Sequence, residues 1–373
     1  MLRVNLFQLK PGMKLAQPVY NADGVLLLAQ GTELSKQEIE RLLSYGVRWV
    51  YIEGYDTPGE LIVDIISQQT RTDAIRTLKN LIFAVAKKEL VPGGYREILD
   101  KVVEKILGEL RESRDKCVKM LDIRTLDSYT YALSVNVCLL SLLVGLAMNF
   151  TEEELKVLGL AALLHDIGKM MVPKEILEKE APLDEEEREE VEQHPYFGYR
   201  LVLEDPQMNP VIAEIIYQHH ERYDGSGYPR GLKGKEILLP ASIVGIADVY
   251  DALTSNRPFR QPLLPHEAVE YLYASGNRFF PIEVVKIFLR HVAVYPLGTV
   301  VRLSNGEKGV VTAINPDLPA KPVVRIITDS RGKKPRATLV RDLARIPNVT
   351  ITHVLEGSEE RAVVRENKLD QLS

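Results

Sequence analysis

Six metal-type ligands lie within one stretch of this 373-residue chain. They are His165, Asp166, His194, His219, His220 and Asp248. Imidazole and carboxylate groups are side chains that hold Zn, Mn, Fe or Ni in proteins. Their spacing suits successive helices of a bundle, where ligands on facing helices build a metal site in the core. The stretch therefore predicts one buried polynuclear centre, and it favours an enzyme over a scaffold.

Two of the histidines are expected to end helices that point inward. Thr151 and Glu154 have the pattern of a capping box, so a helix is expected to begin there and reach His165. A second helix, which carries His219, is expected to stop near His220, because residues 224–227 (DGSG) are strongly turn-forming. On both helices the histidine continues a stripe of apolar residues at three-to-four spacing. Both imidazoles are therefore expected to face a common interior.

The composition excludes several classes of partner. A formal net charge of -5 gives no overall basic field for a nucleic-acid polymer or an anionic membrane. The longest apolar stretch, residues 135–148, is shorter than the roughly 18 residues that cross a bilayer, and no signal-peptide pattern opens the chain. Cys117 and Cys138 are too few for a disulfide framework. We therefore predict a cytoplasmic protein with neither a nucleic-acid polymer nor a membrane as partner.

Changes in pattern along the chain predict a mainly α fold in five parts. They are a small α/β module over residues 1–55, a helical linker over 56–120, a helical body with the ligands over 121–292, a small β-barrel-like domain over 293–355 and a polar tail over 356–373. The first module is either regulatory or dimerising, or only a packing appendage. The apolar stripe of the linker fits a connection across a homodimer, although such stripes are more often plain core.

Three segments of the helical body resemble the signature of the HD-GYP domain. They are residues 163–169 (LLHDIGK), 219–229 (HHERYDGSGYP) and 247–255 (ADVYDALTS). Their combination in this order is highly specific. The resemblance covers residues 121–292 and implies an all-helical HD-type catalytic domain, from a branch of the HD metal-dependent phosphohydrolases. The flanking α/β and β-rich modules also resemble extensions found beside such domains.

The resemblance implies an activity and a ligand set. Members of the family hydrolyse the bacterial second messenger cyclic di-GMP to the linear dinucleotide, to GMP or to both. Two divalent ions, of Mn, Fe, Ni or Zn, would hold a bridging hydroxide and polarise the phosphodiester. The implied ligands are His165, Asp166 and Asp248 for the first ion, and Asp166, His194, His219 and His220 for the second.

The resemblance also implies residues that act on the substrate. Lys169 would contact the phosphate and act with Asp166 in catalysis. Asp251, Arg257 and Arg260 would bind the dinucleotide. Tyr228 belongs to the signature loop, where it would either stack on a base or only pack the loop.

One position departs from the family pattern. Family members carry a histidine ligand of the first metal in a Tyr-Thr-x-x-His-Ser motif, and this chain has Leu133 there. Leucine has no donor atom, so the first ion keeps three protein ligands. Two interpretations follow from this loss. The domain is either a phosphodiesterase that needs a high metal concentration for activity, or a cyclic di-GMP receptor with only one bound ion.

Overall fold

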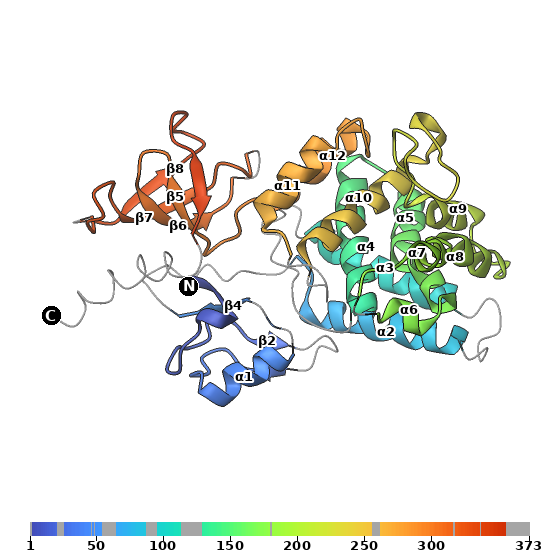
Figure 1. Ribbon diagram of the computed structural model, residues 1–373, viewed down its shortest axis with the longest axis horizontal. Coiled ribbons are helices and arrows are strands. Elements are labelled where there is room, and N and C mark those ends of the chain that lie inside the picture. The colour runs from blue at the N-terminus through green and yellow to red at the C-terminus, as the bar shows by residue number, and fades with distance from the viewer. Residues whose placement is uncertain are drawn as a thin grey trace. The chain divides into compact units, whose positions relative to one another are not determined.

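In this computed structural model, two compact units can be distinguished, and each is described by itself. One unit is helical and comprises the described residues of 65–115 and 128–291. The other takes in both ends of the chain, from 1–64 and 292–373 (Figure 1). The structure describes residues 2–20, 26–45, 47, 49–53, 65–86, 95–112, 129–179, 181–255, 262–315, 318–335 and 337–355.

The helical unit confirms the predicted mainly α fold class. Its longer helices are α2 (Gln68–Ala86), α3 (Arg96–Glu112), α4 (Tyr129–Ala147), α5 (Glu152–Leu164), α8 (His194–Leu203), α9 (Pro210–Gln218), α10 (Leu239–Thr254), α11 (Pro265–Ala274) and α12 (Ile282–Arg290). Shorter elements are η3 (Ile167–Met171), α6 (Lys174–Leu177), α7 (Glu185–Glu192) and η4 (Gly234–Glu236). Helix α4 packs against α5 and α10, and α9 packs against α5 and α8. None of the helices in the described part of the chain has the length and hydropathy that a bilayer span requires.

The predicted start and end of the ligand-bearing helices are confirmed. The Thr151 hydroxyl accepts from the Glu154 backbone N–H at 3.3 Å, and the Glu154 carboxylate accepts from the Thr151 N–H at 2.8 Å. This capping box satisfies backbone donors at the start of α5. Helix α5 ends at Leu164 and α9 ends at Gln218, so His165 and His219 are the C-cap residues. The polar ligands therefore lie where two buried helices end.

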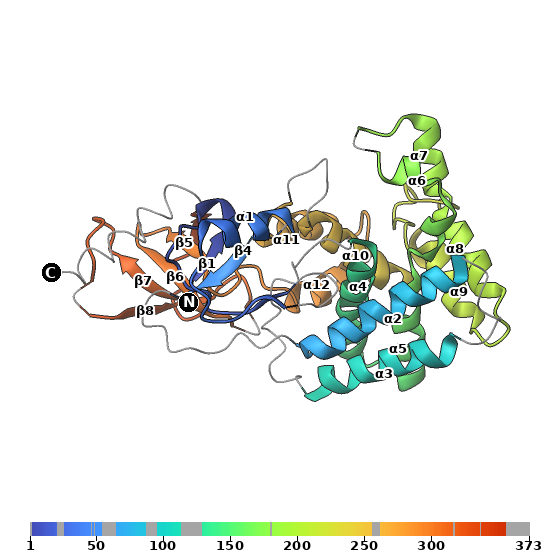
Figure 2. The same cartoon turned by 90° about the horizontal axis from the view of Figure 1, so that it is seen from below.

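Helices α2 and α3 lie in the segment predicted as a linker, and both belong to the helical unit. They pack against each other, α2 also contacts α4, and α3 also contacts α5 (Figure 2). Their inner faces are buried, with Leu78, Val103 and Ile106 almost inaccessible to solvent. The apolar stripe of this segment is therefore core of the ligand-bearing unit.

The second unit is built from short antiparallel strands. Near the N-terminus it contains β1 (Leu2–Asn5), η1 (Leu6–Gln8), β2 (Val19–Tyr20), β3 (Leu26–Leu28), α1 (Lys36–Ser44) and β4 (Trp49–Ile52). Near the C-terminus it contains β5 (Val300–Leu303), β6 (Lys308–Ala313), β7 (Val323–Thr328), β8 (Leu339–Asp342) and β9 (Ile351–Val354). Strand β1 pairs with β4, and β2 with β3, while the last five strands form one sheet in the order β8-β7-β6-β5-β9.

The two ends of the chain share one hydrophobic core. Leu15 and Leu42, from the N-terminal part, are fully buried. The cluster that contains them also includes Val300, Val310 and Ile327 of the C-terminal sheet. In sequence these groups are more than 250 residues apart, so their packing could not be read from local patterns.

Candidate metal centre

The six predicted ligands come from four places in the helical unit. His165 and Asp166 connect α5 to η3. His194 is the first residue of α8, and His219 and His220 follow α9. Asp248 lies within α10. Apart from Asp248, the donors sit at helix ends, where a side chain can turn into the space between helices.

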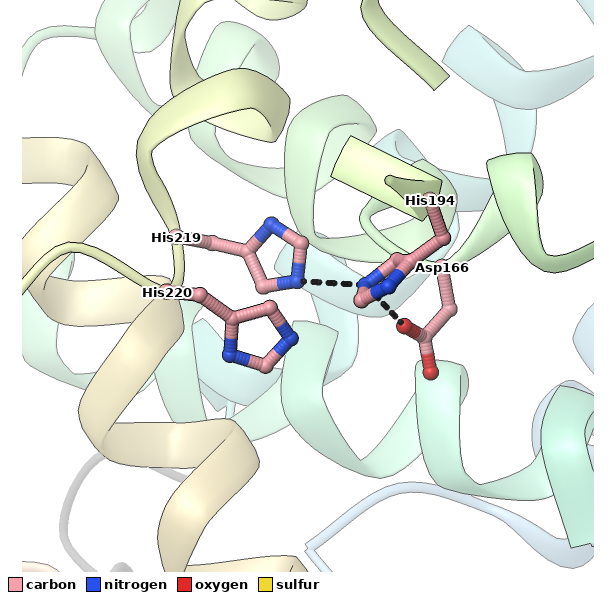
Figure 3. A group of neighbouring side chains, drawn as sticks. All are labelled: Asp166, His194, His219 and His220. Carbon is pink, nitrogen blue, oxygen red and sulfur yellow. Dashed lines mark hydrogen bonds and ion pairs between the residues drawn. The ribbon is translucent and has the colours of Figure 1, made fainter. Parts of the chain in front are cut away.

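Four of the ligands meet closely enough to hold one ion. One donor atom each from Asp166, His194, His219 and His220 lies within 4.8 Å of every other (Figure 3). The Nε2 atom of His194 is 3.3 Å from Asp166 Oδ1 and 3.4 Å from His219 Nε2. This is the set that the sequence resemblance assigns to the second ion.

The other two ligands adjoin this group through Asp166. His165 Nε2 lies 3.4 Å from Asp166 Oδ2 and 3.8 Å from Asp248 Oδ1. The His165 and His219 rings meet edge to face, with centroids 5.2 Å apart. Asp166 therefore has one oxygen toward each group, which is the position that a bridging carboxylate requires.

Backbone carbonyls fix the orientation of three imidazoles. The Nδ1 atoms of His165, His194 and His219 lie 2.6 to 2.8 Å from the carbonyl oxygen three residues earlier in the chain. A carbonyl only accepts, so each Nδ1 carries the proton and donates it. In the neutral rings the Nε2 atom then offers a lone pair toward the centre, as in histidines that bind metal.

Two atoms of the centre have no hydrogen-bond partner. His165 Nε2 and Asp166 Oδ1 are buried, and neither makes a hydrogen bond within the described structure. Leaving buried polar groups unpaired is costly, so such groups call for an explanation. The facing Nε2 atoms of His194 and His219 would likewise be two acceptors in contact if both rings are neutral. A divalent cation would satisfy all of these atoms, so the residues present fit a metal.

The charges are those of a cation site. Burial opposes a charge on His165, but Asp166 and Asp248 outweigh burial and raise its pKa to about 10. Burial opposes the charge of Asp248 too, yet His165 holds its pKa at about 2. Burial, and then the neighbouring His165 and His194, lower the pKa of His219 to about 3. At neutral pH the centre thus contains ionised carboxylates, a neutral His219 and a His165 ring that carries a second proton where a metal would bind.

Lys169 borders the centre and remains partly exposed. Its Nζ lies 2.6 Å from Asp166 Oδ2, and its side chain is 30% exposed. The ammonium group therefore contacts the central carboxylate and can also reach a ligand from solvent. Burial would raise the pKa of Asp166. The charge of Lys169, and then that of His165, outweighs burial and lowers this pKa well below its usual range.

The signature loop is held against the pair of histidines. The Tyr228 ring stacks on His220, with centroids 4.7 Å apart and an interplanar angle of 26°. Glu221 is buried, and its carboxylate accepts from the backbone N–H groups of Arg230 and Leu232 at 2.8 and 2.9 Å. Glu221 therefore folds the loop back over the end of α9. The sequence alone did not assign this role to Glu221.

Close backbone packing explains two glycines around the centre. A Cβ atom on Gly168 would lie 2.0 Å from the carbonyl oxygen of His194. One on Gly227 would lie 2.3 Å from the backbone nitrogen of Arg222. Neither backbone atom can move without shifting the chain segment to which it belongs. Gly168 and Gly227 are therefore required because no side chain fits there, and not because of an unusual φ.

The predicted substrate residues are placed only in part. Asp251 lies in α10, one turn after Asp248, and is buried. Its Oδ1 accepts from the side-chain amide of Asn136 at 3.1 Å, a partner that the sequence did not indicate. Arg257 and Arg260 lie outside the described residues. Leu133, at the position of the missing ligand, is a half-buried residue of α4.

Comparison with known proteins was consistent with this geometry. Residues 116–280 match the HD domain family, and residues 300–362 match the family described as KOW domain associated with HD domain. A cyclic di-GMP phosphodiesterase of Pseudomonas aeruginosa is 36% identical over 244 residues, which are 65% of this chain and 59% of the relative. Residues 116–280 are an HD domain of the HD-GYP type.

Two further proteins extend the comparison of this HD-GYP domain. A cyclic di-GMP phosphodiesterase response regulator of Xanthomonas campestris is 39% identical over 181 residues, covering 48% of this chain and 47% of the relative. The chain thus spans about half the length of these curated relatives. The solved structure of a HDG"Y"P protein from Bdellovibrio bacteriovorus aligns with a TM-score of 0.51 and 19% identity, over 77% of this chain and 97% of that one. That similarity supports the fold alone. An HD domain implies a divalent metal, and the Asp166 and histidine cluster is able to hold one.

Proposed function

We propose that this HD-GYP domain hydrolyses cyclic di-GMP, with divalent metal ions, to the linear dinucleotide, to GMP or to both. The observation that carries the proposal is the double donor set around Asp166, in which His165 Nε2 and Asp166 Oδ1 are buried without a hydrogen-bond partner. The named activity of the relatives at 36 and 39% identity supports the choice of substrate. Because this substrate is a second messenger, we propose a cytoplasmic location.

The proposed centre holds two ions, of Mn, Fe, Ni or Zn. His165, Asp166 and Asp248 serve the first ion, and Asp166, His194, His219 and His220 serve the second. Bound ions of this kind neutralise a phosphodiester and lower the pKa of water, so that hydrolysis needs no covalent intermediate.

The protein side chains then have distinct tasks. Asp166 keeps both halves of the centre together, and the Nδ1 hydrogen bonds of the histidines hold their Nε2 atoms in position. Lys169 is close enough to Asp166, and exposed enough, to pair with a phosphate oxygen of the substrate. Tyr228 and Asp251 complete the proposed substrate contacts on the described residues. We also assign Arg257 and Arg260 to this role, on the sequence resemblance alone.

Leu133 favours a second candidate function. Without an imidazole at this position the first ion has three protein ligands, and loss of a ligand weakens metal affinity by at least about tenfold. A domain with only the second ion bound would hold cyclic di-GMP with slow turnover or none. Such a domain would act as a receptor for the messenger.

A hydrolysis assay on metal-loaded protein tests the proposal. Protein stripped with a chelator and reloaded with Mn, Fe, Ni or Zn is expected to release linear dinucleotide or GMP from cyclic di-GMP. His194→Ala should reduce the rate by at least about a hundredfold, because it removes a donor from the tightest cluster. The matched control is His353→Ala, which alters an exposed histidine of β9 in the other unit.

Two results would contradict the phosphodiesterase proposal. Absence of turnover by fully metal-loaded protein with every ion would reject hydrolysis. If calorimetry shows that the same inactive protein binds cyclic di-GMP, the receptor function is supported instead. Absence of both binding and turnover would reject cyclic di-GMP as the ligand.

A further inference from the structure

A buried polar chain crosses three helices beside the metal centre. The guanidinium of Arg71 on α2 donates to Asn136 Oδ1 on α4 at 3.0 Å. The amide nitrogen of Asn136 donates to Asp251 Oδ1 on α10 at 3.1 Å. All three side chains are at least 90% buried. A positive charge on α2 is thus linked, through one amide, to a carboxylate on the helix that carries Asp248.

The chemistry of the three groups fixes their order. Arginine only donates and an ionised carboxylate only accepts. The amide between them must therefore turn its oxygen to Arg71 and its nitrogen to Asp251. The opposite orientation would place the amide nitrogen against the donor groups of Arg71 and the amide oxygen against the carboxylate of Asp251. Asn136 therefore has one stable orientation.

The chain ends at the carboxylate of Asp251, which is also bonded to its own helix. Asp251 Oδ2 accepts from the hydroxyl of Ser255 at 3.2 Å. Asn136 and Ser255 thus contact different oxygens of the same carboxylate, and the network fixes the position of the Asp251 side chain on α10.

Two of these helices also bear positions of the first metal site: Asp248 on α10 and Leu133, in place of a ligand, on α4. Asp251 follows Asp248 by one turn of α10, and Asn136 follows Leu133 by one turn of α4. Residues one turn apart lie on the same face of a helix. The polar chain therefore runs alongside the first metal site and ends on the helix face that adjoins it.

Stability alone gives a poor account of this network. Burying an arginine, an amide and a carboxylate requires extensive desolvation, and hydrophobic replacements of similar volume are often as stable. Moreover, α2 lies outside the matched HD domain of residues 116–280. A helix from outside that segment supplies the charge.

We propose that Arg71 is a positioning residue for substrate binding, which acts through Asn136 to hold Asp251 toward the cyclic dinucleotide. This inference rests on the proposed function, in which Asp251 contacts the substrate. It makes α2 part of the substrate-binding body of the protein. Arg71 itself touches neither the metal ligands nor the reacting phosphate in this assignment.

The test compares Arg71→Met with Arg76→Met in the metal-loaded full chain. Arg76 lies on the same helix, but its side chain is 67% exposed and pairs at the surface with Asp73. We expect Arg71→Met to raise the Kd and KM for cyclic di-GMP by about tenfold, as expected for losing a hydrogen bond to a charged group. The kcat and the metal content should stay within about threefold, and Arg76→Met should match wild type. Arg71→Lys keeps the charge and one donor, so it should recover most of the affinity.

The outcomes separate this inference from the proposed function. Unchanged Kd and KM in Arg71→Met, or a loss confined to kcat or to the amount of folded protein, would overturn the positioning role. If Arg71→Met yields no folded protein, Arg71→Lys and Asn136→Asp decide, since both retain polar side chains of similar size, and unchanged affinity in both overturns the proposal. Wild-type protein that neither binds nor hydrolyses cyclic di-GMP would instead reject the proposed function and this inference with it.

Discussion

At the residue scale, the centre depends on where three imidazole protons lie. The carbonyls of Ala162, Val191 and Ile216 each accept from a histidine Nδ1, which leaves Nε2 for the metal. Residue spacing predicted the six donors, and the structure brings them together. Residue spacing could not predict the Nδ1 contacts, because these contacts depend on the exact end of each helix.

Metal uptake is predicted to release a proton. Without metal, His165 is protonated at neutral pH because Asp166 and Asp248 outweigh burial and raise its pKa to about 10. A metal ion binds only the deprotonated ring, so affinity for the first site should increase with pH below 10, by about tenfold per unit. Asp248, with a pKa of about 2, is already ionised and adds nothing in this range.

Calorimetric titration of chelator-stripped protein at pH 6, 7 and 8 measures this effect. Buffers with different ionisation enthalpies should reveal about one proton released per ion at that site. Metal affinity that does not change between pH 6 and 8 would show that His165 is not a ligand.

Gly168 provides a second test at this scale. In Gly168→Ala the new methyl group would meet the His194 carbonyl, so η3 and α8 must separate. We expect a loss of about 1–3 kcal/mol in the free energy of unfolding, as for other overpacked sites, together with weaker metal binding. Gly108→Ala is the control, because Gly108 lies in α3 with open space around it, and alanine there should stabilise by up to about 1 kcal/mol. Equal stability and metal affinity of the two variants would contradict the packing argument.

At the element scale, the helix caps and turn residues were the most predictive parts of the sequence. They placed the start of α5 and the end of α9 correctly. The Arg71–Asn136–Asp251 network could not be predicted, since its members are 65 and 115 residues apart.

The cap of α5 should contribute measurably to stability. Thr151→Ala removes the hydroxyl that accepts from the Glu154 N–H, so the free energy of unfolding should fall by about 1 kcal/mol. Urea denaturation, followed by the helical signal of the protein, measures the change in the free energy of unfolding. Thr151→Ser keeps the acceptor and should remain close to wild type; a loss equal to that of the alanine variant would mean that the cap is not the cause.

At the scale of the whole molecule, the two ends of the chain form one unit. Local patterns suggested separate N- and C-terminal modules, whereas Leu42 of α1 belongs to the same core as Val310 and Ile327. We expect Leu42→Ala to destabilise this unit by about 2–5 kcal/mol. Amide hydrogen exchange in β6 and β7 should then accelerate together with that in β4.

An exposed leucine of the same unit is the control for that experiment. Leu26 in β3 is 49% exposed, so Leu26→Ala should leave exchange in β6 and β7 nearly unchanged. If Leu42→Ala accelerates exchange only in residues 2–52, the two ends fold independently and the shared core is not cooperative.

The central claim is that the centre is a two-ion hydrolytic site whose first ion lacks one imidazole, at Leu133. The most direct measurement follows bound metal and cyclic di-GMP hydrolysis in one titration with Mn, for wild-type protein and Leu133→His. We predict that wild type reaches full activity only at free Mn at least about tenfold higher than the variant requires, with activity rising as the second equivalent binds. Identical metal dependence of the two proteins, or no hydrolysis by either one with two ions bound, would contradict the claim.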